Sequence, residues 1–224
     1  MKSLLAMLLA GGAIAAAQAQ APSPAPATMD ALRRNFPADH GTLAASLAGK
    51  SIRETAPLVH AGMQRFLQSH RESIVAAPPA TILALEARQA ALLRAVERKD
   101  VQVCARVGDR GLFSTEMLPA LPVAGLDEYG AALIEAARPA AGKTAAPDPN
   151  AEDLTAWIAA IEKIQPDVPV QKMLLDREFR AAATPAQLCR GAAAMHEAVA
   201  KLPQPQAERV ARMLLKSSVA PDGP

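Results

Sequence analysis

Apolar side chains recur at intervals of three and four along most of the chain, which is the pattern of helices that bury one face. No stretch alternates β-branched or aromatic residues with polar ones between hairpin turns. The pattern predicts an all-α fold, an irregular bundle of six to eight helices. The clearest apolar stripes are Val59, Met63, Phe66, His70 and Ile74; Ile82, Leu85, Leu92, Val96, Val103 and Val107; and Leu154, Trp157, Ile158, Ile161 and Ile164.

Capping residues and prolines predict where several helices begin. Ser51 and Glu54 have the spacing of a capping box, although Pro57 would also suit a start nearer Thr55. The clearest start is the sequence T-P-A-Q at 184–187, which combines a cap, a first-turn proline and a glutamine. Both patterns predict helices that continue into apolar stripes.

Other boundaries follow from the same signals. Thr28 is expected to cap a first short helix. A single helix should run from Pro79 to about Val107, although polar residues interrupt its stripe, and residues 170–180 should form another short helix.

The N-terminus has the pattern of a cleavable signal peptide. Lys2 precedes an uncharged run from Leu4 to Ala17, and Ala17-Gln18-Ala19 matches an A-x-A cleavage site. The alternative is an uncleaved membrane anchor, for which the run is short. We therefore predict a signal peptide over 1–19, and no later stretch resembles a membrane span.

Composition divides the remaining chain into segments. Residues 20–27 are rich in Pro and Ala and are expected to form a flexible leader. A helical domain should cover 28–216, with a subdomain boundary in the breaker-rich loop 139–150, and residues 217–224 should form a disordered tail.

The net charge and the aromatic content of the chain argue against two classes of function. The chain has 24 Lys and Arg against 22 Asp and Glu, and only 3% of its residues are aromatic. A nucleic-acid-binding protein usually carries a basic excess or a basic stripe, and a carbohydrate groove usually carries aromatic platforms. The sequence therefore gives no indication of nucleic-acid binding and disfavours a sugar site.

The two cysteines, Cys104 and Cys189, fit an exported protein. Oxidising compartments favour disulfides, and the alternative is two buried free thiols. Each cysteine lies beside an apolar stripe, so a bridge would join two helices at the edge of their shared core. We predict one inter-helix disulfide and a periplasmic or secreted location.

Histidines are the main candidates for chemistry. His70 lies within an apolar stripe, where a buried ring needs a partner, and Glu86 on the next helix is one candidate. His196-Glu197 begins like a zinc-binding H-E-x-x-H motif, but position 200 is Ala200, so the simpler interpretation is a polar flank of the helix. A structural role is the commoner one for His70 as well.

Further candidates are weaker. Ser114 lies near glycines without a nucleophile elbow, and Asp127 is better explained as a cap than as a catalytic acid. Arg209, Arg212 and Lys216 share one face of the last helix and form a candidate basic surface for an acidic partner or lipid headgroups, against the simpler interpretation of a solvated face.

No motif identifies a reaction, a metal or a cofactor. The favoured hypothesis is an exported soluble helical protein with a non-catalytic binding or accessory role, its partner being another protein or a small apolar ligand. The alternative is a small exported hydrolase whose site assembles from His70, His196 and distant carboxylates. If the protein carries a small apolar ligand, we expect an enclosed cavity lined by Ala, Leu and Met.

Overall fold

The computed structural model describes residues 25–138 and 147–219. Within these ranges every regular element is a helix, so the predicted all-α fold is confirmed. The helices are α1 (Pro26–Asn35), α2 (Pro37–Leu47), α3 (Ile52–Val75), α4 (Pro79–Lys99), α5 (Val101–Arg110), the 3₁₀-helix η1 (Thr115–Ala120), α6 (Leu126–Ala137), α7 (Ala151–Ile164), α8 (Val170–Leu175), α9 (Arg177–Ala182), α10 (Pro185–Val199) and α11 (Gln204–Ser218).

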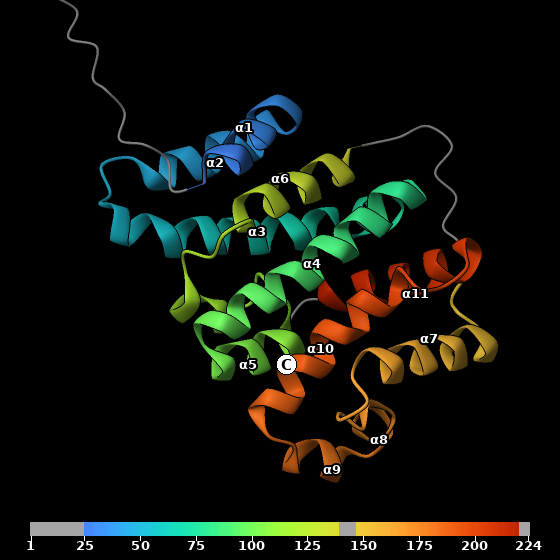
Figure 1. The fold of residues 1–224 in the computed structure, drawn as a ribbon. Helices are drawn as coiled ribbons and strands as arrows, with labels where there is room; N and C mark the ends of the chain where they lie inside the picture. Colours follow the sequence, from blue (N-terminus) through green and yellow to red (C-terminus); the bar gives the residue numbers. More distant parts are fainter. Residues whose placement is uncertain (1–24, 139–146, 220–224) are drawn as a thin grey trace, which may run out of the picture.

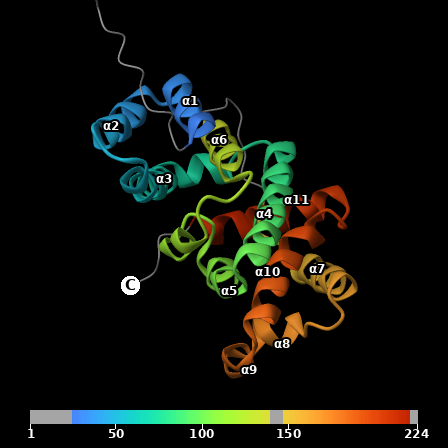
Figure 2. The same cartoon turned by 60° about the vertical axis from the view of Figure 1, so that its left-hand side comes forward.

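The bundle has two ends with a helical core between them (Figures 1 and 2). At one end α1 and α2 pack together, and α1 and α3 pack on α6. In the middle, α10 packs against α4, α5 and α7, while α11 packs on α4. The short helices α8 and α9 lie at the opposite end in both views.

Two predicted helix starts are confirmed. α3 begins at Ile52 with a complete capping box between Ser51 and Glu54, so the alternative start near Thr55 is wrong. α10 begins at Pro185 with the capping box between Thr184 and Gln187. Both starts depend on residues within one turn, which is why the sequence pattern identifies them.

The start of α1 differs from the prediction. α1 begins at Pro26, so its first two residues fall within the predicted leader 20–27, and Thr28 is not its cap. The carboxylate of Asp127 accepts hydrogen bonds of 2.8 Å from the backbone N–H groups of Ala27 and Thr28. Asp127 therefore caps the neighbouring α1 across the α1–α6 contact, and not its own helix, whose N-cap is Gly125.

Residues 25–138 and 147–219 contain 12 helices, more than the six to eight predicted. Two of the additional helices arise because aspartates divide helices that the sequence pattern joined. Asp100 adopts an extended backbone, and its side chain accepts from the N–H groups of Gln102 and Val103, which ends α4 and starts α5. Asp176 separates α8 from α9 in the same way, accepting from Phe179. Aspartate is a strong N-cap, so a local bond outweighs the continuing apolar stripe.

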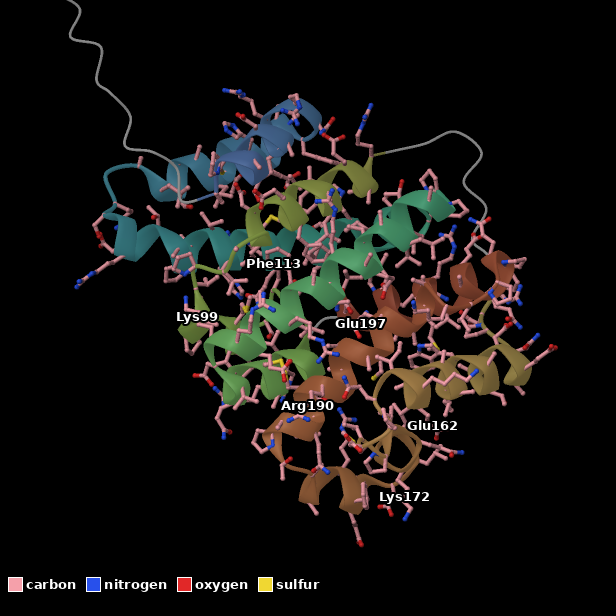
Figure 3. All side chains as sticks on the ribbon, in the orientation of Figure 1. Lys99, Phe113, Glu162, Lys172, Arg190 and Glu197 are labelled. Carbon is pink, nitrogen blue, oxygen red and sulfur yellow. A yellow bond between two sulfur atoms is a disulfide. The ribbon has the colours of Figure 1, made fainter. Side chains whose placement is uncertain are left out.

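The seam between α4 and α10 runs antiparallel. Arg94 of α4 donates two hydrogen bonds, of 2.9 and 3.2 Å, to Glu197 of α10. Arg190, nearly two turns earlier on α10, lies 3.6 Å from Glu97. Figure 3 shows Arg190 and Glu197 spaced along α10. These pairs are partly exposed and contribute little stability, but they fix the relative direction of the two helices.

The predicted disulfide joins Cys104 of α5 to Cys189 of α10, with both residues fully buried. One turn further along the contact between α5 and α10, Gly108 faces Ala192 closely. A Cβ added at Gly108 would lie 2.5 Å from the Ala192 Cβ. The absence of a side chain at Gly108 therefore permits the close approach of these two helices.

Core side chains come from both sides of residues 139–146. Trp157 of α7, for example, is buried and donates its indole N–H to the carbonyl of Met195 on α10 at 2.8 Å. The subdomain boundary at 139–150 stays a prediction, since residues 139–146 lie outside the described part of the chain.

The terminal predictions also lie mostly outside the described residues. The signal peptide 1–19, residues 20–24 of the leader and residues 220–224 of the tail are not covered, and α11 continues to Ser218, beyond the predicted end of the domain at 216. Among the helices of residues 25–138 and 147–219, none combines the length and apolarity that a membrane crossing requires.

Replacing both Cys104 and Cys189 with alanine should lower the free energy of unfolding by about 2 to 4 kcal/mol, because the bridge closes a long loop of the unfolded chain. Urea unfolding followed by circular dichroism checks this, and the helical signal of the folded variant should persist. Equal stability of the wild type with and without reductant would contradict a structural bridge.

Gly108→Ala should destabilise the protein by about 1 to 3 kcal/mol, since the new methyl group overlaps that of Ala192. The double variant Gly108→Ala/Ala192→Gly should recover most of this loss, because the overlap disappears and the helix propensities of the exchanged residues cancel. Thermal melts of the three proteins measure the effect. A double variant no more stable than Gly108→Ala would show that the two helices do not touch here.

Candidate functional site

A cluster of buried polar side chains lies at the centre of the bundle. Glu86 and Gln89 stand three residues apart on α4 and therefore share its buried face. Tyr129 of α6, His196 of α10 and Ser218 at the end of α11 reach the same place. Four of the five residues are buried, and Glu86 is only 1% exposed.

Hydrogen bonds connect these side chains into one network. The Tyr129 hydroxyl donates to Gln89 Oε1 at 2.7 Å. Gln89 Nε2 donates to Ser218 Oγ at 3.0 Å and faces His196 Nε2 at 3.1 Å. An amide nitrogen only donates, so His196 Nε2 must accept, and the ring proton lies on Nδ1. In this arrangement Nδ1 donates to Glu86 Oε2 at 2.5 Å, and the ring carries a single proton.

Glu86 is the incomplete member of the network. Its Oε1 is buried, and no residue of the described ranges donates a hydrogen bond to it. A buried carboxylate with a single hydrogen-bond donor is costly, because burial removes most of its solvation. The protein therefore carries an unsatisfied acceptor at a defined position.

The buried environment of the network changes the pKa of Tyr129. Full burial raises the pKa of the Tyr129 phenol well above its usual value, and the charge of Glu86 raises it further. Tyr129 consequently keeps its proton and serves as the fixed donor to Gln89.

A pocket of about 200 Å³ opens beside Glu86 and His196. Its walls come from α4, α10, α11 and the turn that joins the last two helices. Glu86 and His196 are buried, whereas Ala87, Ala200 and Gln204 are exposed and lie at the rim. The lining is mainly aliphatic: Leu83, Glu86, Ala87, His196, Val199, Ala200, Leu202, Gln204 and Ala207.

The structure brings two of the predicted site residues together, but not in the predicted pairing. The partnership of His70 with Glu86 is wrong, since Glu86 binds His196. His70 packs against the rings of Phe36 and Phe66, which also contact each other, and Asp39 Oδ2 lies 3.4 Å from its Nε2. His70 and His196 thus have no contact partner in common.

The interpretation of His196 as a polar helix flank is also wrong, because the ring is only 7% exposed. Gln89, Tyr129 and Ser218 were missed as members of the site. The signal available in the sequence was Gln89, which interrupts an apolar stripe three residues after Glu86. Two polar residues on the buried face of one helix require partners, although the pattern does not say which.

The three cations of the predicted basic surface already bind groups of the protein. Arg209 binds Asp153 through two hydrogen bonds of 2.6 Å, which lower the pKa of that carboxyl group. Arg212 is buried and donates to Glu208 and to the carbonyl of Val75. Lys216 binds Asp148. Binding of an acidic partner at this face stays a prediction, and the contacts do not support it.

Ser114 lies beside His60, but the two residues are not in a catalytic arrangement. His60 Nε2 donates to the Ser114 carbonyl at 2.5 Å, while the Ser114 hydroxyl donates to the Gly111 carbonyl at 2.7 Å. A nucleophile and its base would require a bond between the hydroxyl and the ring. Burial is the main cause that lowers the pKa of His60, and the bond to Ser114 opposes it.

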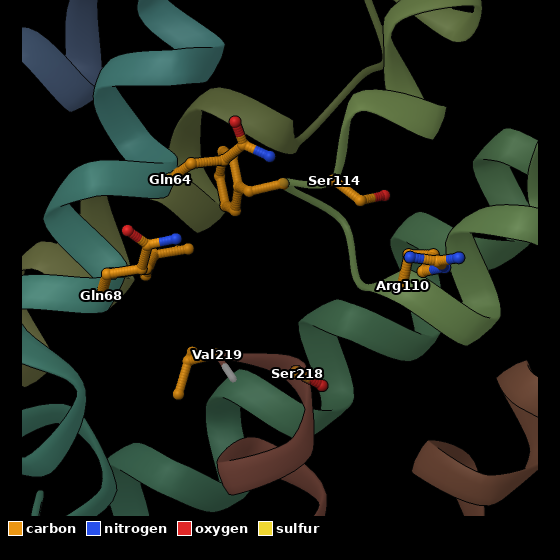
Figure 4. Close-up of a pocket in the computed structure, with 8 residues that line it drawn as sticks. Gln64, Gln68, Arg110, Ser114, Ser218 and Val219 are labelled. Carbon is orange, nitrogen blue, oxygen red and sulfur yellow. The ribbon is translucent and has the colours of Figure 1, made fainter. Parts of the chain in front are cut away.

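A second, smaller pocket lies next to Ser114. Figure 4 shows Gln64 and Gln68 of α3 across from Ser218 and Val219, with Arg110 and Ser114 to one side. Its volume of about 30 Å³ suits one water molecule rather than an organic ligand. The pocket beside Glu86 is therefore the candidate ligand site.

Metal ligands do not gather in the described ranges: residues 25–138 and 147–219 contain no group of three His, Cys, Asp or Glu side chains placed to hold an ion. No protein-family model, curated protein or solved structure matches the chain.

Tyr129→Phe should destabilise the protein by about 1 to 3 kcal/mol, because Gln89 Oε1 would lose its donor while remaining buried. Chemical denaturation of the two proteins at neutral pH measures the difference. A change below about 0.5 kcal/mol, the usual effect of a neutral surface substitution, would show that the hydroxyl does not hold Gln89.

His60 should make stability depend on pH. Because its pKa is lowered in the folded state, the unfolded chain takes up a proton that the folded protein refuses, and stability should fall as pH falls below about 6.5. In His60→Gln the amide can still donate to Ser114 but does not titrate. Wild type should therefore lose more stability than the variant between about pH 7 and pH 5.

Melting temperatures of both proteins across this range provide the measurement. The other titrating groups are common to the two proteins, so they cancel in the comparison. Parallel pH profiles would contradict a lowered pKa for His60.

Proposed function

We propose that this chain is an exported, non-catalytic protein that binds a small molecule with an aliphatic part in the pocket beside Glu86 and His196. The observation that carries the proposal is the pocket itself, which combines aliphatic walls with one buried carboxylate whose Oε1 lacks a donor. Ligand sites typically have this composition, a largely apolar lining with a few convergent polar groups.

Two features support export. The Cys104–Cys189 bridge is of the kind that persists in oxidising compartments. The first 19 residues have the charge and apolar pattern of a signal peptide. A binding protein in the periplasm or outside the cell accounts for both features.

The enzyme alternative has one observation in its favour, the buried pair of His196 and Glu86, which resembles a base held by a carboxylate. However, His196 Nε2 already accepts from Gln89, so the nitrogen that would take a proton is occupied. The residues that line the pocket include no Ser, Thr, Cys or Lys to act as a nucleophile. Binding is therefore the better supported function.

Binding should be blocked by a large side chain at the rim. Ala87 is an exposed alanine of α4 that lines the pocket, and Ala84 is an exposed alanine of the same helix that does not. Ala87→Phe should abolish binding of an aliphatic probe, whereas Ala84→Phe should leave it unchanged. Both substitutions have the same effect on helix propensity, so they form a matched pair.

Butan-1-ol serves as the probe, and ¹⁵N–¹H spectra of the mature protein report its binding. Saturable shifts should be concentrated at pocket residues such as Val199 and Leu202. Shifts that do not saturate, or that persist unchanged in Ala87→Phe, would contradict a ligand site here.

A further inference from the structure

The charges around the pocket are unbalanced. Glu86 is the only acidic residue in the lining, and none of the lining residues is Lys or Arg. His196 is the basic residue of the lining, but its Nε2 accepts from Gln89 and its single proton is donated to Glu86 Oε2. Gln89, Tyr129 and Ser218 complete the network with neutral groups. No cation of the described network therefore compensates the carboxylate.

The arrangement of the pocket gives a ligand a direction. Glu86 is 1% exposed and lies at the inner end, whereas Ala87, Ala200 and Gln204 lie at the exposed rim. Leu83, Val199 and Leu202 form aliphatic walls. A molecule that fills the pocket would meet the Glu86 side chain on one side and hydrocarbon over most of its remaining surface.

We propose that the pocket selects a small aliphatic ammonium ion, with its nitrogen donating to Glu86 Oε1 and its alkyl part against Leu83, Val199 and Leu202. The inference rests on the proposed function, because it names the class of ligand for the same site. A bound ammonium satisfies the acceptor of the described network that lacks a donor and supplies a positive charge at once.

Other ligand classes fit less well. A carboxylate or phosphate would bring a second negative charge next to Glu86, and the lining offers neither Lys nor Arg to bind it. A neutral alcohol can donate to Glu86 Oε1 but leaves the charge uncompensated. A metal ion requires more ligands than this single carboxylate and a ring whose nitrogens are both engaged.

Three probes of equal alkyl length separate these classes: n-butylammonium, butan-1-ol and butyrate. Each is titrated into the mature protein at fixed ionic strength and pH 7, and ¹⁵N–¹H shifts give the dissociation constants. n-Butylammonium should bind at least about tenfold more tightly than butan-1-ol, as one charge-assisted hydrogen bond provides. Butyrate should bind most weakly of the three.

Glu86→Gln tests the role of the carboxylate. The glutamine can still accept from His196 Nδ1, and its amide nitrogen replaces the oxygen that lacks a donor. This variant should lose the roughly tenfold preference for n-butylammonium over butan-1-ol. Ala84→Phe should keep the preference, and circular dichroism checks that each variant is folded.

The possible failures are distinguishable. If butan-1-ol binds and Ala87→Phe blocks it, but n-butylammonium binds no more tightly, the proposed function stands and the ammonium inference is overturned. If the preference for n-butylammonium persists in Glu86→Gln, the cation is recognised elsewhere and the inference is equally overturned. If none of the three probes gives saturable shifts, both proposals fail.

Discussion

The packing of α10 against α4 and α5 is the constraint on which the rest of the structure depends. The disulfide between Cys104 and Cys189 fixes one end of this packing, and the pairing of Gly108 with Ala192 lets the helices approach closely one turn away. Further along α10 the same alignment carries His196 to Glu86. The stability of the fold and the geometry of the site therefore come from one helix seam.

The composition of the core explains why a polar network can exist there. Much of the α10 seam is built from alanine and glycine, which pack closely but bury little hydrocarbon per residue. Polar side chains from α4, α6, α10 and α11 meet there and form hydrogen bonds with one another. Glu86 Oε1 is the exception, and unsatisfied groups of this kind are concentrated at functional sites because evolution otherwise removes their energetic cost.

Local signals account for the parts of the fold that the sequence predicts correctly. The starts of α3 and α10 and the helical class depend on residues within a turn or two, and the disulfide follows from having only two cysteines. The break at Asp100 was missed because the apolar stripe continues across it. Glu86 and His196 were both candidates, yet their pairing joins residues 110 apart, and no periodicity states that α10 covers α4.

The protonation state of His196 tests the account most directly, since the unbalanced charge of Glu86 depends on it. Long-range ¹H–¹⁵N spectra of the imidazole rings at neutral pH distinguish the two tautomers from the imidazolium ion. A neutral ring is expected for His196, with the proton on Nδ1 and with Nε2 unprotonated. A doubly protonated ring would mean that the protein already supplies the counter-ion of Glu86, which would contradict the account.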